Sequence, residues 1–223
     1  MKRDVRKSFI VVGLGKFGYS VAVELESLRG EVLAIDVNED EVRKVASKVT
    51  RCAVCDASSL TALRELGLEG VTDGIIAIGD DLQASILTLM NLKELGVERV
   101  VVRLSDKAYQ PIFERLGANK FVIPEEASGS TLAHSLIARN VSDYYDIGAK
   151  HSIVRLKVGE NFVPKTLIEL NSRNKYEVNI IGVFRGNTFN IPYGSDSIYP
   201  GDELLIVGKN EKLTRFDYFI NRI

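Results

Sequence analysis

Four residues near the start of the chain have the types and spacing that bind a phosphate and a ribose. Gly13, Gly15 and Gly18 form Gly-x-Gly-x-x-Gly directly after an apolar run, and Asp36 follows Gly18 by 18 positions. Gly13 permits a tight turn, Gly15 lets the backbone approach a phosphate, and Gly18 lets a helix pack closely on a strand. A helix that begins here also offers free N–H groups to phosphate oxygens.

Asp36 strengthens the prediction of a nucleotide site, which the glycines alone support only weakly. A carboxylate at the end of the second strand accepts hydrogen bonds from both ribose hydroxyls, and its charge disfavours the 2′-phosphate of an NADP-type ligand. The alternative role, as a turn residue or helix cap, suits Asn38 better than Asp36.

Two further strand ends are expected at the same crevice, since ligands of open α/β sheets lie outside the carboxyl ends of the strands. The third strand ends at Cys55-Asp56-Ala57 and the fourth at Ala77-Ile78-Gly79. Asp81 follows the fourth strand, and we interpret it as the N-cap of the next helix rather than as a ligand.

Lys16 bears on which nucleotide is bound. Its ammonium inside the glycine loop could pair with a terminal phosphate of ATP or ADP, whereas a dinucleotide would continue to a second ribose. A surface lysine on the first helical turn is an equally good interpretation, so both stay open.

Short β-branched runs alternate with helical patterns from residue 8 to about 123, which predicts a Rossmann-like, doubly wound parallel sheet of an α/β domain. The expected strands are Ser8–Val12, Glu31–Asp36, Thr50–Val54, Gly74–Ile78, Arg99–Arg103 and Lys120–Ile123. The expected helices are Lys16–Leu28, Glu39–Val49, Ser59–Leu66, Leu82–Leu95 and Ala108–Leu116.

A crossover helix and a second, smaller module are expected after the sheet. Residues Gly129–Val141 place Leu132, Leu136, Ile137 and Val141 at helical spacing, on a helix free to pack against a partner. Residues 152–158, 179–185, 187–193 and 203–209 read as strands, with a helical piece at Lys165–Asn171. We therefore predict domains at 1–143 and 144–223, the second a small α+β lobe.

Composition excludes several classes of protein. The 223 residues carry 29 basic and 30 acidic side chains, so no global field attracts nucleic acid. No apolar run is long enough to span a bilayer, and MKRDVRKS contains no secretory core, so we expect a cytoplasmic protein. Cys52 and Cys55 should point to opposite faces of a strand, which favours packing over redox or zinc roles.

Candidates for acid–base catalysis are missing from the sequence. The two histidines, His134 and His151, follow no strand end of the predicted sheet, and no tyrosine is followed four residues later by lysine. We therefore expect a binding protein rather than an enzyme. A small NAD(H)-dependent oxidoreductase of unknown substrate is the alternative.

The ordered motifs GLGKFG, AIDVNE, CDAS, AIGDDLQAS, VVRLSD and GANKFVIPEE resemble the RCK (regulator of potassium conductance) family, in particular its KtrA/TrkA-type cytosolic subunits. The resemblance extends over nearly the whole chain. It implies a regulatory subunit of a potassium channel or transporter in the membrane, which binds ATP, ADP, AMP or NAD(H) and assembles into dimers and octameric rings of one or two kinds of subunit.

The resemblance also assigns residues. Phosphate contacts fall on Gly13, Gly15, Lys16, Phe17, Gly18 and Arg103, ribose contacts on Asp36 and Asn38, and contacts near adenine on Asp56 and Ala57. Further nucleotide contacts fall on Cys55 and, along the fourth strand, on Ala77, Ile78 and Gly79. Glu125 corresponds to a ligand of a divalent cation, Mg²⁺ or Ca²⁺, near the dimer axis. Cyclic di-AMP could bind the C-terminal lobe through Ile181, Arg185, Asn190 and Pro192. Lysine at position 16, where arginine is common, keeps the charge but loses the bidentate fork.

Overall fold

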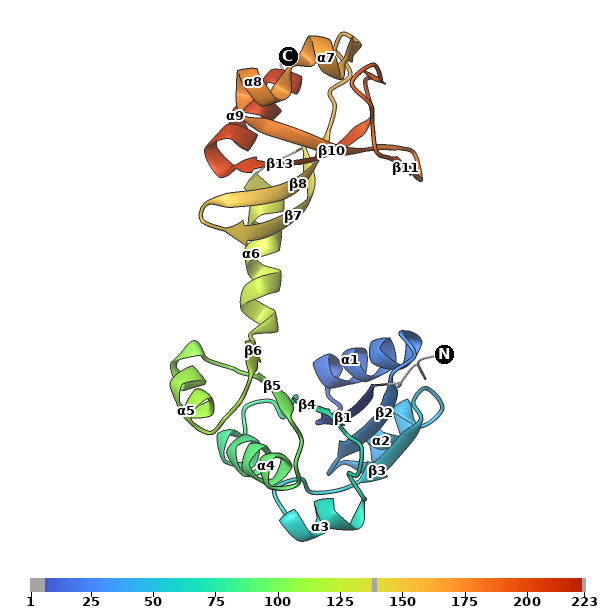
Figure 1. Ribbon diagram of the computed structural model, residues 1–223, viewed down its shortest axis with the longest axis vertical. Helices are drawn as coiled ribbons and strands as arrows, with labels where there is room; N and C mark the ends of the chain where they lie inside the picture. The colour runs from blue at the N-terminus through green and yellow to red at the C-terminus, as the bar shows by residue number, and fades with distance from the viewer. Residues whose placement is uncertain (1–6, 138–139, 222–223) are drawn as a thin grey trace, which may run out of the picture. The chain divides into compact units, whose positions relative to one another are not determined.

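The structure, a computed structural model, describes residues 7–137 and 140–221, with the side chains of residues 134, 135 and 137 outside the description. Backbone contacts divide the chain into two compact units, Met1–Pro124 and Glu125–Ile223 (Figure 1). The predicted domain boundary after residue 143 stays a prediction, and each unit is described by itself below.

The first unit is built on a six-stranded parallel sheet in the order β3-β2-β1-β4-β5-β6, which confirms the predicted Rossmann-like fold. Its strands are β1 Ser8–Val12, β2 Glu31–Asp36, β3 Arg51–Val54, β4 Asp73–Ile76, β5 Arg99–Arg103 and β6 Lys120–Val122. Its helices are α1 Lys16–Ser27, α2 Glu39–Val45, α3 Leu60–Glu65, α4 Leu82–Glu94, the short 3₁₀ helix η1 Lys107–Tyr109 and α5 Gln110–Arg115.

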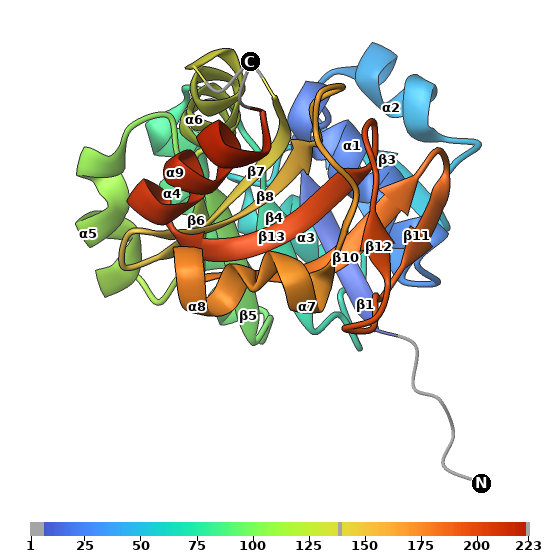
Figure 2. The same ribbon diagram turned by 90° about the horizontal axis from the view of Figure 1, so that it is seen from above.

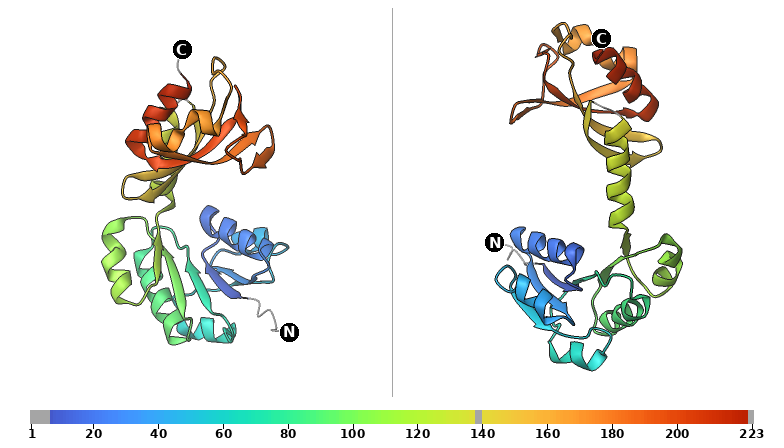
Figure 3. Two further views of the ribbon diagram at one scale, coloured as in Figure 1. Left: turned by 45° about the horizontal axis from the view of Figure 1, so that its top comes forward. Right: turned by 180° about the vertical axis from the view of Figure 1, so that it is seen from behind.

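Both faces of this sheet are buried. Val11 and Ala34 pack with Ala22 of α1 and Val45 of α2, on the side where Figure 1 shows these two helices. Alternate strand residues face the other way and join a core with the side chains of α3, α4 and α5. Figure 3 shows the same two layers of helices from other sides. Because helices cover both faces, a ligand can reach the sheet only at its ends.

Helices α2 and α6 differ from their predicted ranges by more than two residues at one end or both. Helix α2 ends at Val45 instead of Val49, since the following residues turn toward β3. Helix α6, Pro124–Ile137, replaces the prediction of Gly129–Val141. Proline is favoured at the first helical position and acids in the first turn, so the helix begins five residues earlier. Leu132 and Leu136 on α6 are exposed, and the side chain of Ile137 lies outside the described residues.

The second unit contains a five-stranded antiparallel sheet in the order β11-β10-β13-β8-β7 and a separate β9–β12 pair. Figure 2 looks onto this lobe, with β13 between β8 and β10. After α6, the elements are β7 Val141–Gly148, β8 His151–Lys157, β9 Lys165–Thr166, α7 Leu167–Leu170, α8 Ser172–Tyr176, β10 Val178–Arg185, β11 Thr188–Asn190, β12 Ser197–Ile198, β13 Glu203–Lys209 and α9 Asn210–Ile220. The predicted α+β lobe is confirmed.

The core of this lobe lies between the sheet and α9. Phe216 and Leu213 of α9 pack on Leu156 of β8 and Leu204 of β13. Neither α9 nor the edge strand β7 was predicted, so Val141, expected in a helix, is the first residue of a strand.

Candidate functional site

The glycine loop joins β1 to α1 beside the end of β4. Gly13 has a φ of +89°, and a Cβ on it would lie 2.8 Å from the backbone of Ala77. A Cβ on Gly18 would lie 1.8 Å from the carbonyl oxygen of Gly13. Only glycine fits at either position without moving the backbone. Three of the predicted site residues, Gly13, Gly18 and Ala77, are therefore in contact, as is Ile78 through its backbone nitrogen, 2.9 Å from the same position.

The N-terminus of α1 is open. Gly15 is its N-cap residue, no side chain caps the helix, and no acid lies in its first turn. A Cβ on Gly15 would meet nothing within 4 Å. By contrast, Asn38 caps α2 and Asp81 caps α4, as their sequence positions indicated. The backbone N–H groups at the start of α1 are thus available to an anion.

Lys16 and Phe17 are the first two residues of α1. Lys16 is exposed and Phe17 is partly buried. An exposed ammonium beside an uncapped helix start adds positive charge to the same place.

Asp36 lies beside the loop and is fixed by backbone donors. Its Oδ2 accepts a hydrogen bond from the N–H of Leu14 at 2.6 Å, and its Oδ1 accepts one from the N–H of Asn38 at 2.8 Å. Each carboxylate oxygen has a second lone pair that can accept a ribose hydroxyl. Sequence reasoning gave Asp36 only a ligand role, whereas the structure also makes it the anchor of the glycine loop.

The loop after β3 continues this edge of the site. The Cys55 N–H donates to the carbonyl of Asp36 at 2.9 Å, and Oδ1 of Asp56 accepts hydrogen bonds from the backbone and hydroxyl of Ser58. Ala57 is buried. Asn91 of α4, which sequence reasoning missed, donates to two carbonyls of this loop.

The two cysteines pack on opposite faces of the sheet. Cys52 joins the core beneath α1 and α2, and Cys55 joins the core on the side of α3 to α5. Burial raises the pKa of the Cys55 thiol, and nearby Asp56 raises it further. A thiol held protonated is a poor nucleophile, which agrees with the expected packing role.

Gly79 and Arg103 meet at the ends of β4 and β5. A Cβ on Gly79 would lie 3.7 Å from Nη1 of Arg103, and both residues line a small pocket with Ser85, Ser105 and Tyr109. The predicted residues thus form a continuous edge along the carboxyl ends of β3, β2, β1, β4 and β5.

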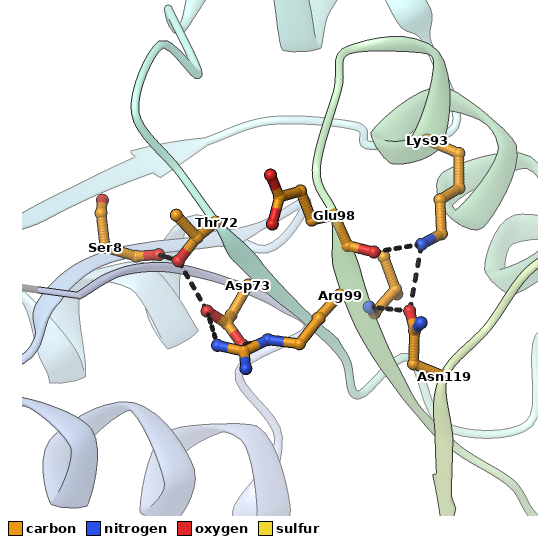
Figure 4. Close-up of polar contacts among 8 residues, drawn as sticks. Ser8, Thr72, Asp73, Lys93, Glu98, Arg99 and Asn119 are labelled. Carbon is orange, nitrogen blue, oxygen red and sulfur yellow. Dashed lines mark hydrogen bonds and ion pairs between the residues drawn. The ribbon is translucent and has the colours of Figure 1, made fainter.

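The amino-terminal end of the same sheet is closed by side-chain contacts (Figure 4). Arg99 binds Asp73 through two nitrogens, at 2.7 and 2.8 Å, and the Thr72 hydroxyl donates to the same carboxylate at 2.6 Å. Burial alone would raise the pKa of Asp73, but these hydrogen bonds outweigh it and hold the pKa below its usual value. Burial lowers the pKa of Lys93, which donates to Asn119.

The divalent-cation site predicted at Glu125 stays a prediction. Glu125 is exposed in the first turn of α6. Among the residues that the structure describes, no three His, Cys, Asp or Glu side chains come together as a metal site. The Nδ1 atom of His151 lies 2.8 Å from the Ala149 carbonyl, and the side chain of His134 is outside the described residues.

The C-terminal lobe contains a groove of about 690 Å³. Arg185, Asn190 and Pro192 line it, and the exposed Tyr193 and Tyr199 lie beside them. Arg185 is held in place by a two-point ion pair with buried Asp202, at 2.8 and 2.9 Å. Burial would raise the pKa of Asp202, but the Arg185 contact lowers it below its usual value. Ile181, the fourth predicted residue, does not line this groove.

Comparisons with known proteins agree with this two-part fold. The TrkA-N domain model matches residues 9–124 and the TrkA-C domain model matches residues 151–220. Ktr system potassium uptake proteins C and A of Bacillus subtilis (strain 168) are 33% and 35% identical to the chain, over 96% and 97% of it and 97% and 98% of their own lengths. The RCK domain of GsuK matches with a TM-score of 0.64 at 16% identity, over 99% of this chain and 49% of that one, and so shows the fold.

These matches place the chain in a class of proteins that join a Rossmann-type domain to a small antiparallel lobe, as regulators of potassium conductance do. The chain belongs to the RCK family, in its KtrA/TrkA-type branch. In the part of the chain that the structure describes, no helix has the length and apolarity required to span a bilayer.

Proposed function

We propose that the chain is the cytosolic regulatory subunit of a potassium uptake channel or transporter and binds an adenine nucleotide or NAD(H) as an allosteric ligand. The observation that carries the proposal is the open, uncapped start of α1 beside Asp36. The family membership adds the biological setting, since the Ktr relatives are potassium uptake proteins.

The geometry suits a phosphate followed by a ribose. Phosphate oxygens would accept from the N–H groups at the start of α1, with Gly15 leaving room and Lys16 and Arg103 supplying charge. The ribose hydroxyls would donate to Asp36, and the base would lie toward Asp56 and Ala57. ATP, ADP, AMP and NAD(H) share this adenosine half, so all four are candidates.

Binding without chemistry distinguishes this proposal from an oxidoreductase. The purified chain is melted with ATP, ADP, AMP and NADH, and each ligand is recovered and analysed afterward. We expect at least one ligand to raise the Tm, because a ligand that binds only the native state stabilises it. We also expect every ligand to be recovered chemically unchanged. Steady turnover of NADH or ATP would support the enzyme alternative instead.

Ring assembly is the second part of the proposal. Exposed Leu132 and Leu136 on α6 offer an apolar surface to a second subunit, and rings multiply a small preference for one ligand state. Light scattering tests this, with an expected mass of eight times 24.7 kDa in a homomeric octamer. A monomer at every concentration and with every nucleotide would contradict it. Co-purification with a membrane potassium channel subunit tests the partner.

We also propose that the groove in the C-terminal lobe binds cyclic di-AMP. The fixed Arg185 guanidinium offers charge to a phosphate, and Tyr193 and Tyr199 offer aromatic faces to adenine. Titration calorimetry with cyclic di-AMP tests this on wild type and Tyr193→Ala, a residue 79% exposed. Equal affinity in both proteins would show that Tyr193 does not contact cyclic di-AMP. Absence of binding to wild type would refute the assignment of the groove as a cyclic di-AMP site.

The proposed divalent cation at Glu125 requires a second subunit. One exposed carboxylate is too few ligands for Mg²⁺ or Ca²⁺, so the site would be completed at the dimer axis. Glu125→Gln should abolish stabilisation of the oligomer by Mg²⁺ or Ca²⁺ while leaving nucleotide affinity unchanged. Stabilisation that persists in the variant would exclude Glu125 as a ligand.

A further inference from the structure

Asn91 ties α4 to the loop between β3 and α3. Its side-chain amide donates to the carbonyl oxygens of Ala57, at 3.0 Å, and Ser58, at 2.9 Å. Because both partners are acceptors, the amide nitrogen must face them, and the two bonds occupy both of its donors. Asn91 is partly buried on a helix whose neighbouring Leu92 is fully buried.

These bonds tie the middle of the loop to α4, in addition to the packing of Cys55 and Ala57 in the core and the bond from the Ser59 N–H to the Asp56 carbonyl. The Cys55 N–H is bonded to β2, and Asp56 folds back on Ser58. Buried carbonyls need partners, so losing the amide would leave two unsatisfied acceptors against α4. The loop would then shift away from the helix.

The same helix also holds the loop after β4. The hydroxyl of Ser85, which is 4% exposed, donates to the carbonyl of Ile78 at 3.3 Å. Helix α4 therefore contacts two loops of the predicted nucleotide site: the loop after β4 through Ser85, and the loop near adenine through Asn91.

We propose that Asn91 is a positioning residue of the nucleotide site, an inference that rests on the proposed function. It holds Asp56 and Ala57 where they contact the purine, and it does so without touching the ligand. Groups that recognise a base by hydrogen bonds must stay within well under about 1 Å of their positions. A loop released from α4 therefore loses its selectivity for the purine.

The test compares ADP with IDP, which differ only in the purine ring. Asn91→Asp keeps the shape but turns a carboxylate oxygen toward the two carbonyls, and Asn91→Leu keeps the volume without donors. Gln83→Leu, on an exposed position of α4, is the matched control. We expect Asn91→Asp and Asn91→Leu to raise the Kd of ADP about tenfold, the effect of losing about 1.4 kcal/mol. The ratio of ADP to IDP affinity should fall toward one, and Gln83→Leu should match wild type.

A purely structural role would weaken both ligands equally and leave the affinity ratio unchanged, which would overturn the proposal. So would wild-type ADP affinity in Asn91→Asp, or equal affinity of wild type for ADP and IDP. In either case nucleotide binding by wild type still supports the proposed function. Failure of wild type to bind any nucleotide would refute both.

The wild-type chain provides a second measurement in case the variants fail to fold. The NMR resonances of the Asn91 side-chain amide should shift when ADP is added, because its two acceptors belong to a ligand-contacting loop. Those of Gln83 should not shift. Unchanged Asn91 resonances at saturating ADP would overturn the proposal.

Discussion

Alanine substitutions at Gly15 and Gly18 should separate an effect on nucleotide binding from an effect on folding. Gly18→Ala places a methyl group 1.8 Å from the backbone oxygen of Gly13, which cannot rotate away. Overpacking of this severity should cost at least about 3 kcal/mol of unfolding free energy, or roughly 6–12 °C in Tm for a chain of this size. Gly15→Ala meets nothing within 4 Å and has a φ of −58°, so the free energy of unfolding should change by less than about 1 kcal/mol.

Nucleotide affinity should respond to Gly15→Ala even though folding does not. The methyl group would stand where a phosphate approaches the start of α1, and losing one hydrogen bond to a charged group costs about 1.5–3 kcal/mol. That loss corresponds to a roughly 10- to 100-fold higher Kd by titration calorimetry. Gly129→Ala in α6, which also has open space, serves as the control and should leave affinity unchanged. Wild-type affinity in a well-folded Gly15→Ala protein would refute the phosphate-loop assignment.

Three further variants test separate parts of the structure. Asp36→Asn keeps one acceptor oxygen but turns its NH₂ group toward the backbone N–H of either Leu14 or Asn38. Both the Tm, measured by thermal melting, and the nucleotide affinity, measured by calorimetry, should therefore fall. Lys150→Gly should raise the unfolding free energy by about 0.5–1 kcal/mol in urea titrations, because position 150 has a φ of +62° in the β7–β8 turn. The pKa of Asp73 in the folded protein lies below its unfolded value of about 3.9. The contact with Arg99 therefore stabilises the folded protein fully at pH values above the unfolded pKa, and this stabilisation is lost as the pH falls through the folded pKa. The stability difference between wild type and Asp73→Asn should therefore begin to shrink as the pH falls toward the unfolded value of about 3.9, and it should continue to shrink below that pH.

Controls accompany these variants. Glu31→Gln at the opposite end of β2 removes a similar charge and should preserve nucleotide binding, so loss of binding there would mean that charge alone matters. Gly148→Ala, with a φ of +84°, should destabilise the β7–β8 hairpin. A stability gain from Gly148→Ala, or a loss from Lys150→Gly, would contradict the turn argument. A pH-independent difference for Asp73→Asn would contradict the ion-pair argument.

The fold was largely predictable because its signals are local. Apolar strands bounded by helix-ending glycines such as Gly96 and Gly117, both with positive φ, mark most elements of the parallel sheet. Strand β7 was missed because Ser142 to Asp146 is polar and tyrosine-rich, without a clean alternation. Helix α9 could have been found, since Leu213, Phe216 and Ile220 repeat at helical spacing.

The site was predictable as a set of strand ends but not as a network. The bond between Leu14 and Asp36 depends on the register of β1 against β2, which brings residues 22 positions apart into contact. Asn91 carries no local signal at all, because a lone asparagine inside a helix gives no indication of what its side chain reaches. Long-range side-chain contacts of this kind follow from tertiary packing alone.

Hydrogen–deuterium exchange with and without saturating ADP tests the central claim most directly. Nucleotide binding at the carboxyl end of the sheet predicts slower exchange at residues 13–18, 36–38 and 55–59. No comparable protection is expected around Thr72 and Asp73 at the opposite end. Bound ADP with protection confined to other segments, or no binding of ADP, ATP, AMP or NADH, would contradict the account.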